Sequence, residues 1–148
     1  MEDITTIHGD YVISTDKNKL QVNVIHRFLT EESAWSKGIS LVRVAKCIAT
    51  SLNFGIYYNE MQVGYARVIS DFATVAYLGD VFVLHEFRSR GLSKLLMQEV
   101  INHPELHGLR RWILLTNDAH ELYKQYGWTE LHNPEKWMEK HNPGVYKG

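Results

Sequence analysis

Two arginines and a glycine in the stretch FRSRGLSKLLMQEV (residues 87–100) have the residue types and the spacing of an anion-binding turn. The preceding AYLGDVFVL is almost wholly apolar, as in a buried strand, and apolar residues recur at helical spacing after Gly91. The first backbone N–H groups of a helix lack partners inside it, and the helix dipole adds partial positive charge there. With Arg88 and Arg90 beside it, this turn suits a phosphate or pyrophosphate. Plain strand-to-helix connectivity would give the same pattern.

Asp80 is a lone carboxylate within the apolar strand AYLGDVFVL. Carboxylates are seldom buried without a partner or a task. Asp80 is therefore either a proton-transfer group or a capping or ion-pairing residue, with Arg67 or Arg111 as the partner. The chain has neither a G-x-x-x-x-G-K-[ST] nor a G-x-G-x-x-G motif, which excludes a P-loop and a dinucleotide fingerprint.

The elements that must position these residues can be read along the chain. We expect strands at residues 10–16, 73–85, 110–118 and 128–131, a hairpin of two strands around Asn59 and Glu60, and helices at residues 19–30, 40–51, 91–103 and 119–127. A loop with Trp35 joins the first two helices. The unit from residue 75 to residue 116 should be parallel, with a right-handed crossover, while the early strands form a meander.

Length and composition predict one domain, residues 1–148, with a core at about residues 10–131. Hydrophobic residues make up 45% of the chain, enough for a full core. A net charge of −1 and the lack of a long apolar stretch argue against nucleic acid and membrane as partners. The single cysteine, Cys47, excludes an intramolecular disulfide and fits a cytoplasmic location.

Two linked motifs resemble the GNAT family of N-acetyltransferases. VFVLHEFRSRGLS is similar to its acyl-CoA-binding motif, [Q/R]-x-x-G-x-[G/A], with Arg88, Gly91 and Ser93 at the defined positions. NDAHELYKQYGW resembles its downstream element, an Asn followed by a helix with a Tyr and then a Gly-aromatic pair. The resemblance implies an α/β (α+β) fold with a mixed, mostly antiparallel central sheet, a parallel β-α-β acyl-CoA-binding unit and flanking helices.

The resemblance also implies acetyl-CoA as the co-substrate. Ser93 departs from the family pattern, since a hydroxymethyl group stands where Gly or Ala usually leaves room for the pyrophosphate. Asn117 matches the family's cofactor-contacting Asn, although an N-cap role for Asn117 or Asp118 stays open. The implied cofactor-binding residues are Phe82, Val83, Arg88, Ser89, Arg90, Gly91, Leu92, Ser93 and Asn117.

Three groups would then carry the reaction. The backbone N–H of Val83 would stabilise the developing oxyanion of the thioester. An alkyl amine must lose a proton before it attacks, and Asp80 is the candidate base, with its ion-pair role as the alternative. Tyr123 matches the family's general acid for the thiolate, while packing in the core is its alternative role.

We therefore expect an acetyl-CoA-dependent N-acetyltransferase that acts on the amine of a small molecule or an amino acid by direct attack. A protein Lys or N-terminal acetyltransferase and a noncatalytic acyl-CoA-binding module are the alternatives. No metal is expected, because His103 and His107 are separated by Pro104, which breaks the helix. A homodimer through an edge strand is compatible with such a sheet.

Overall fold

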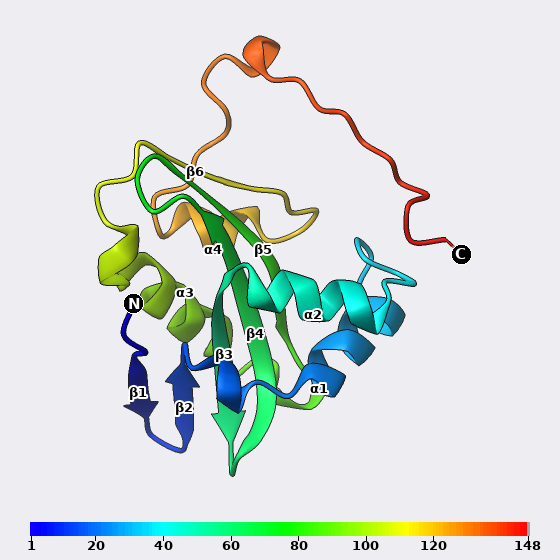
Figure 1. Cartoon of the computed structure of the whole chain (residues 1–148). Helices are drawn as coiled ribbons and strands as arrows, with labels where there is room; N and C mark the ends of the chain where they lie inside the picture. The colour runs from blue at the N-terminus through cyan, green and yellow to red at the C-terminus, as the bar shows by residue number, and fades with distance from the viewer. Residues whose placement is uncertain (148) are drawn as a thin grey trace.

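The computed structural model describes residues 1–147 and contains one mixed six-stranded sheet (Figure 1). The strands lie in the order of the sequence and are β1 (Thr5–His8), β2 (Tyr11–Ser14), β3 (Leu52–Tyr58), β4 (Met61–Ser70), β5 (Val75–Val83) and β6 (Arg111–Leu114). Neighbouring strands from β1 to β5 are antiparallel, whereas β5 and β6 are parallel. The expected mixed, mostly antiparallel sheet with one parallel unit is confirmed.

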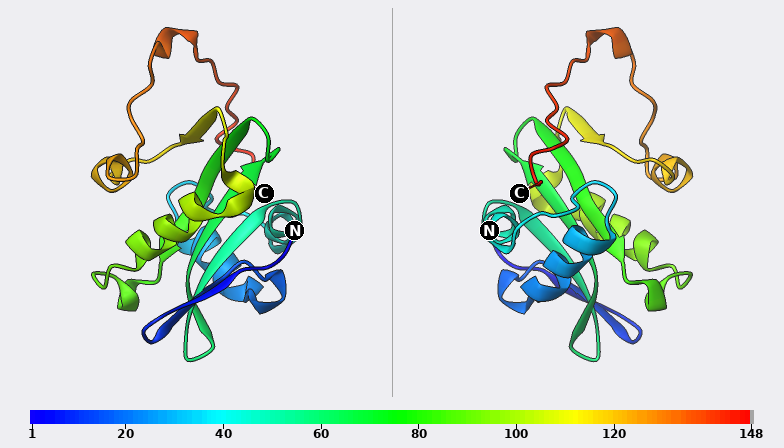
Figure 2. Two further views of the ribbon diagram at one scale, coloured as in Figure 1. Left: turned by 90° about the vertical axis from the view of Figure 1, so that its left-hand side faces the viewer. Right: turned by 90° about the vertical axis from the view of Figure 1, so that its right-hand side faces the viewer.

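Helices cover both faces of this sheet. The helical segments are α1 (Val22–Arg27), the π-helical turn η2 (Phe28–Glu32), α2 (Leu41–Ala49), α3 (Leu92–Asn102), α4 (His120–Lys124) and the 3-10 turns η1 (Lys17–Lys19), η3 (His85–Phe87), η4 (Pro104–Leu106) and η5 (Pro134–Lys136). Figure 2 shows α1 and α2 on one face and α3 on the other. The apolar face of α3 seals its side of the sheet with Leu92, Leu96, Met97 and Val100. Each such buried side chain stabilises the fold by about 1.5–3 kcal/mol.

The hairpin of β3 and β4 forms where the sequence predicts it. Asn59 and Glu60 both have positive φ, 48° and 68°, as a two-residue type I′ turn requires. Strand β1 was not predicted from the sequence. A signal for it is present, because the turn pair of Gly9 and Asp10 stands between the β-branched run of β1 and the next strand. Strand β1 is short and half exposed, so its apolar pattern is weak.

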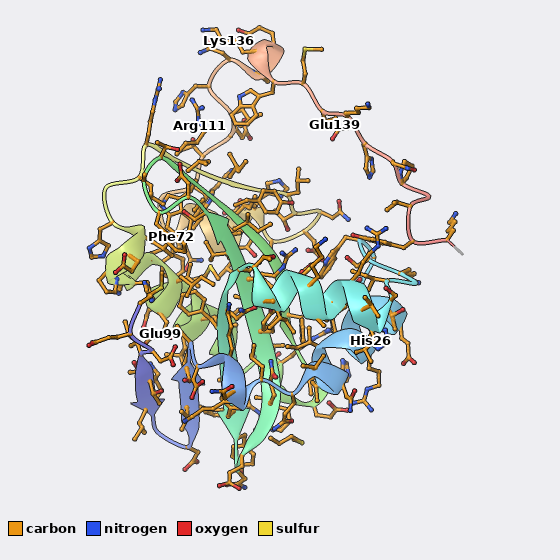
Figure 3. The ribbon with its side chains drawn as sticks, viewed as in Figure 1. His26, Phe72, Glu99, Arg111, Lys136 and Glu139 are labelled. Atoms are coloured by element: carbon orange, nitrogen blue, oxygen red, sulfur yellow. The ribbon has the colours of Figure 1, made fainter. Side chains whose placement is uncertain are left out.

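Glu99 joins this N-terminal strand to α3 (Figure 3). Its carboxylate lies 2.8 Å from His8 Nε2 and accepts a hydrogen bond from the Thr6 hydroxyl at 3.3 Å. The two contacts hold the edge of the sheet to the helix that follows the Gly91 turn.

The strand predicted at residues 128–131 is wrong. Trp128 donates its backbone N–H to the Tyr123 carbonyl at 3.3 Å, so the chain turns back on α4 instead of pairing with β6. The Trp128 ring packs edge-on against Trp112 and Tyr123, with centroids at 5.5 and 5.7 Å. Beside this contact, β6 and the C-terminal segment together line a cavity of about 880 Å³. The apolar composition of the segment therefore serves side-chain packing, not a strand.

Buried tyrosines make the stability of the fold sensitive to alkali. Burial raises the pKa of Tyr57, Tyr65 and Tyr123 above the ordinary value of 10.0. The folded chain keeps these protons at a pH at which the unfolded chain releases them, so the free energy of unfolding falls as the pH rises above about 10. We expect Tyr57 and Tyr65, whose pKa values are raised most, each to contribute a slope of about 1.4 kcal/mol per pH unit in urea titrations at successive pH values.

Tyr57→Phe is the control for this prediction. The Tyr57 hydroxyl is buried and has no hydrogen-bond partner within residues 1–147, so its removal should leave the stability at neutral pH nearly unchanged. The dependence of the free energy of unfolding on alkaline pH should become less steep by the contribution of one proton, about 1.4 kcal/mol per pH unit. A free energy of unfolding that stays constant between about pH 9 and pH 11 would contradict the prediction.

Candidate active site

The sheet divides between β5 and β6. The two strands pair over only four positions, from Val75 with Arg111 to Leu78 with Leu114. Strand β5 then continues to Val83 along β4 alone, because β6 has ended. The pairing of β4 with β5 is itself irregular, and Asp80 at this β-bulge has a φ of 52°. The edge of β5 that faces away from β4 therefore has no strand partner from Gly79 to Val83 within residues 1–147, and this unpaired edge is called the opening of the sheet.

The backbone of Val83 faces this opening. Leu84 donates its N–H to Val63 of β4 at 2.8 Å, and N–H groups alternate sides along a strand. The N–H of Val83 therefore points away from β4. The Val83 carbonyl points to the same side, where it accepts a hydrogen bond from Arg88 Nε at 3.1 Å. The structure thus gives Val83 the orientation that the expected oxyanion donor needs.

The turn before α3 presents a row of unpaired N–H groups. Ser89 and Gly91 have φ values of 64° and 76°, which fold the chain tightly ahead of the helix. Leu95 is the first residue of this region to donate its backbone N–H, to the Gly91 carbonyl at 3.2 Å. Within residues 1–147 the backbone N–H groups at positions 89–94 have no acceptor. A Cβ on Gly91 would meet open space, so the turn is accessible to a ligand.

The two arginines of the turn differ in their surroundings. Arg88 places its Nε on the Val83 carbonyl, beside the opening. The Arg90 guanidinium donates a hydrogen bond to the Tyr11 hydroxyl at 3.0 Å and lies over the Phe87 ring, 5.0 Å from its centroid. Its guanidinium is thus engaged with β2 and η3, so Arg88 is the arginine placed to supply positive charge at the opening.

Asp80 has two partners. Its Oδ2 lies 2.8 Å from Arg67 Nε in an ion pair whose side chains are 15% and 10% exposed. Its Oδ1 accepts a hydrogen bond from the Trp35 indole at 2.9 Å. Of the two arginines considered from the sequence, Arg67 forms the pair, whereas Arg111 stacks on Trp137 at 5.2 Å (Arg111 is labelled in Figure 3). Each carboxylate oxygen retains a lone pair for a further donor.

Tyr123 packs in the core and also lines a cavity. It belongs to the apolar cluster beneath α3 and is 7% exposed. It borders a cavity of about 470 Å³ together with Leu114, Thr116 and His120. Burial, and secondarily the negative charge of Asp118, raises the pKa of its phenol above the ordinary 10.0. Tyr123 is therefore protonated at neutral pH and can act as a hydrogen-bond donor.

The segment before α4 leaves Asn117 exposed. Ala119 occupies the N-cap position, and its N–H donates to the Thr116 hydroxyl at 3.1 Å. No side chain within residues 1–147 caps α4, so the capping alternative for Asn117 and Asp118 is wrong. Asn117 keeps its side chain available at the end of β6.

Residues 1–147 hold neither a metal site nor a membrane-spanning helix. No cluster of three or more His, Cys, Asp or Glu side chains in this part of the chain is arranged to hold a metal ion. No helix in it has the length and apolar character needed to cross a membrane.

Comparison with known proteins identifies the family of this chain. Residues 50–130 match the model of the acetyltransferase (GNAT) domain. A Gibberella zeae protein assigned as an acetyltransferase is 33% identical over 137 residues, and the match covers 78% of this chain and 76% of that protein. A crystal structure of a Xanthomonas campestris protein assigned to the same family is 50% identical, with a TM-score of 0.91 over 93% of this chain and 97% of that one. The chain belongs to the GNAT family of acetyltransferases.

Proposed function

We propose that the protein transfers an acetyl group from acetyl-CoA to the primary amine of a small molecule or an amino acid. The main support for this proposal is that two sets of backbone N–H donors lie close together along one segment of the chain. The Val83 N–H faces the opening of the sheet, and the unpaired N–H groups of residues 89–94 follow it within one short turn. A fold neighbour from Clostridium acetobutylicum, 16% identical with a TM-score of 0.61, was solved with acetyl-CoA.

The residues present suit this co-substrate. The N–H row and Arg88 would bind the pyrophosphate, since anions are favoured at a helix N-terminus. Ser93 is half-buried in the first turn of α3, and its hydroxyl is a further donor for a phosphate oxygen. Asn117, at the end of β6, would contact the cofactor from the other side of the opening.

The reaction then divides among three groups. Asp80 takes a proton from the acceptor ammonium, directly or through a water, and the neutral amine attacks the thioester carbonyl. The Val83 N–H stabilises the oxyanion as the C–N bond forms. When the C–S bond breaks, the Tyr123 phenol protonates the thiolate, and the proton lost from the new amide nitrogen restores the phenol through solvent.

Calorimetric titration with acetyl-CoA, followed by thiol release with a panel of amines, tests this function. We expect saturable one-site binding and thiol release that depends on the amine. Release with Lys-containing or N-terminal peptides alone would favour a protein acetyltransferase. Binding without release for any acceptor would identify a noncatalytic acyl-CoA-binding module, and no binding at near-millimolar acetyl-CoA would contradict the proposal.

Gly91→Ala tests the phosphate turn, with Gly108→Ala as its matched control. Both glycines have a φ near 75° and open space around the α-carbon, so each substitution should cost about 1–2 kcal/mol of stability. Only the methyl group at position 91 would lie in the proposed pyrophosphate site. We expect Gly91→Ala to weaken acetyl-CoA binding about tenfold or more, because it removes the close approach to the backbone.

Calorimetry on both variants decides the point. Gly108 follows η4, beyond the C-terminal end of α3, so its variant should bind acetyl-CoA as the unsubstituted protein does. Equal affinities for the two variants would show that the turn does not bind the cofactor.

A further inference from the structure

The loop between η2 and α2 is attached to the sheet through Trp35. The indole N–H donates to Asp80 Oδ1 at 2.9 Å, across 45 positions of the sequence. Within residues 1–147 this is the only hydrogen bond between residues 33–38 and a strand. The contact thus links the position of this loop to the position of one carboxylate.

The Trp35 ring has an unusual combination of exposure and contacts. It is 52% exposed, yet its N–H is bound to a carboxylate that is nearly buried. The ring lies 6.3 Å from that of Phe28, which stacks on Phe82 at 4.0 Å. Phe82 precedes Val83, whose N–H faces the opening of the sheet. Trp35, Phe28 and Phe82 therefore form a row of aromatic rings, with the partly exposed Trp35 at one end. The other end of the row is next in sequence to Val83, in the proposed reaction centre.

The two partners of Asp80 restrain its carboxylate at both oxygens. Arg67 binds Oδ2 and Trp35 binds Oδ1. Hydrogen bonds to an ionised group are strong and directional, so the carboxylate cannot rotate without breaking both. Arg67 is on β4, in the rigid centre of the sheet, whereas Trp35 is on a loop. The orientation of Asp80 therefore depends on where this loop lies.

We propose that Trp35 is a positioning residue for acetyl transfer: through its indole N–H, it orients the Asp80 carboxylate toward the acceptor amine. This role rests on the proposed function, in which Asp80 takes the proton of the acceptor. The alternative is that Trp35 anchors the loop without affecting the reaction.

A double-mutant cycle separates these roles. Trp35→Phe keeps an aromatic ring on the side of Phe28 and removes the N–H donor together with part of the indole. We expect it to lower kcat about tenfold, the scale of a small misplacement at a reacting centre, with the Kd for acetyl-CoA unchanged within about twofold. In an Asp80→Asn background it should produce no further loss, since Trp35 acts through that carboxylate.

Trp137→Phe is the matched control, because Trp137 stacks on Arg111 away from Asp80. It should leave kcat unchanged. An unchanged kcat in Trp35→Phe would overturn the proposal. So would equal losses in the two backgrounds, because Trp35 would then act independently of Asp80.

A measurement without turnover tests the contact itself. The chain has four tryptophans, and the indole N–H signal that disappears in Trp35→Phe identifies Trp35 in ¹⁵N-correlated NMR spectra. Asp80→Asn should shift this signal and leave those of the other three in place. An unshifted Trp35 signal would overturn the proposal.

The proposed function can fail separately from this contact. If the unsubstituted protein releases no thiol with any acceptor, the proposed function is overturned, and the positioning role with it. In that case the NMR shift in Asp80→Asn would still be observed. If instead Trp35 does not contact Asp80, the shift would be absent while the unsubstituted protein still releases thiol.

Discussion

Replacing Tyr123 by phenylalanine should lower kcat about 100-fold, while the Kd for acetyl-CoA stays within about twofold. General acids typically contribute 10²–10⁴ to a rate, and the lower end applies here because a phenol is a weak acid beside a thiolate. The raised pKa of the buried Tyr123 keeps it protonated across the neutral range. The factor between the variant and the unsubstituted protein should therefore be the same from about pH 6 to pH 9.

Tyr126→Phe is the control for this experiment. Tyr126 lies three residues after Tyr123, just beyond α4, and its hydroxyl donates to the Lys94 carbonyl at 3.3 Å. It undergoes the same loss of a phenol oxygen outside the proposed reaction centre, so its kcat should not change. Steady-state thiol release and calorimetry on the two variants provide the readout. If Tyr123→Phe kept full turnover, Tyr123 would be only a core residue.

Asp80→Asn should lower kcat about 100-fold and remove the rise of kcat with pH on the acid side. Asparagine is the suitable replacement because position 80 has a φ of 52°, which Asn tolerates well, and its amide oxygen can still accept hydrogen bonds. The substitution therefore removes the charge and the basicity while it preserves the bulge. The pH dependence of kcat is the measurement.

Arg67→Gln separates catalysis from ion pairing at this position. Both variants lose the ion pair, so both should unfold at a lower temperature. Only Asp80→Asn should lose the acid limb, because Arg67→Gln keeps the carboxylate. If the limb persists in Asp80→Asn, Asp80 is a structural ion-pair residue and the proton is taken by another group.

Local sequence signals predicted much of the fold. The turn at Asn59 and Glu60 predicted the hairpin of β3 and β4, and Gly91 predicted the start of α3, because in each case a few adjacent residues determine the backbone. The strand at residues 128–131 failed because pairing requires a free edge at the correct distance, which the local pattern does not encode. Strand β6 and these residues line a cavity together instead of pairing.

For the candidate site, Asp80 could be singled out as a lone carboxylate in an apolar strand, and Arg88 and Tyr123 through the two motifs that resemble those of the family. Their roles stay predictions. The bond between Trp35 and Asp80 could not be predicted, since it depends on how the helices between β2 and β3 pack on the sheet. The difference between Arg88 and Arg90 was also hidden, because it depends on Tyr11, which is far away in sequence.

The four-residue pairing of β5 with β6 has a consequence for how the molecule fluctuates. Asp80 and Val83 lie on β5, which pairs with β4 over most of its length, whereas Tyr123 and Asn117 follow the short strand β6. Segments with few cooperative contacts undergo local unfolding at a lower free energy than the rest of a domain. The segment that carries Tyr123 should therefore open at a lower free energy than the strands from β1 to β5.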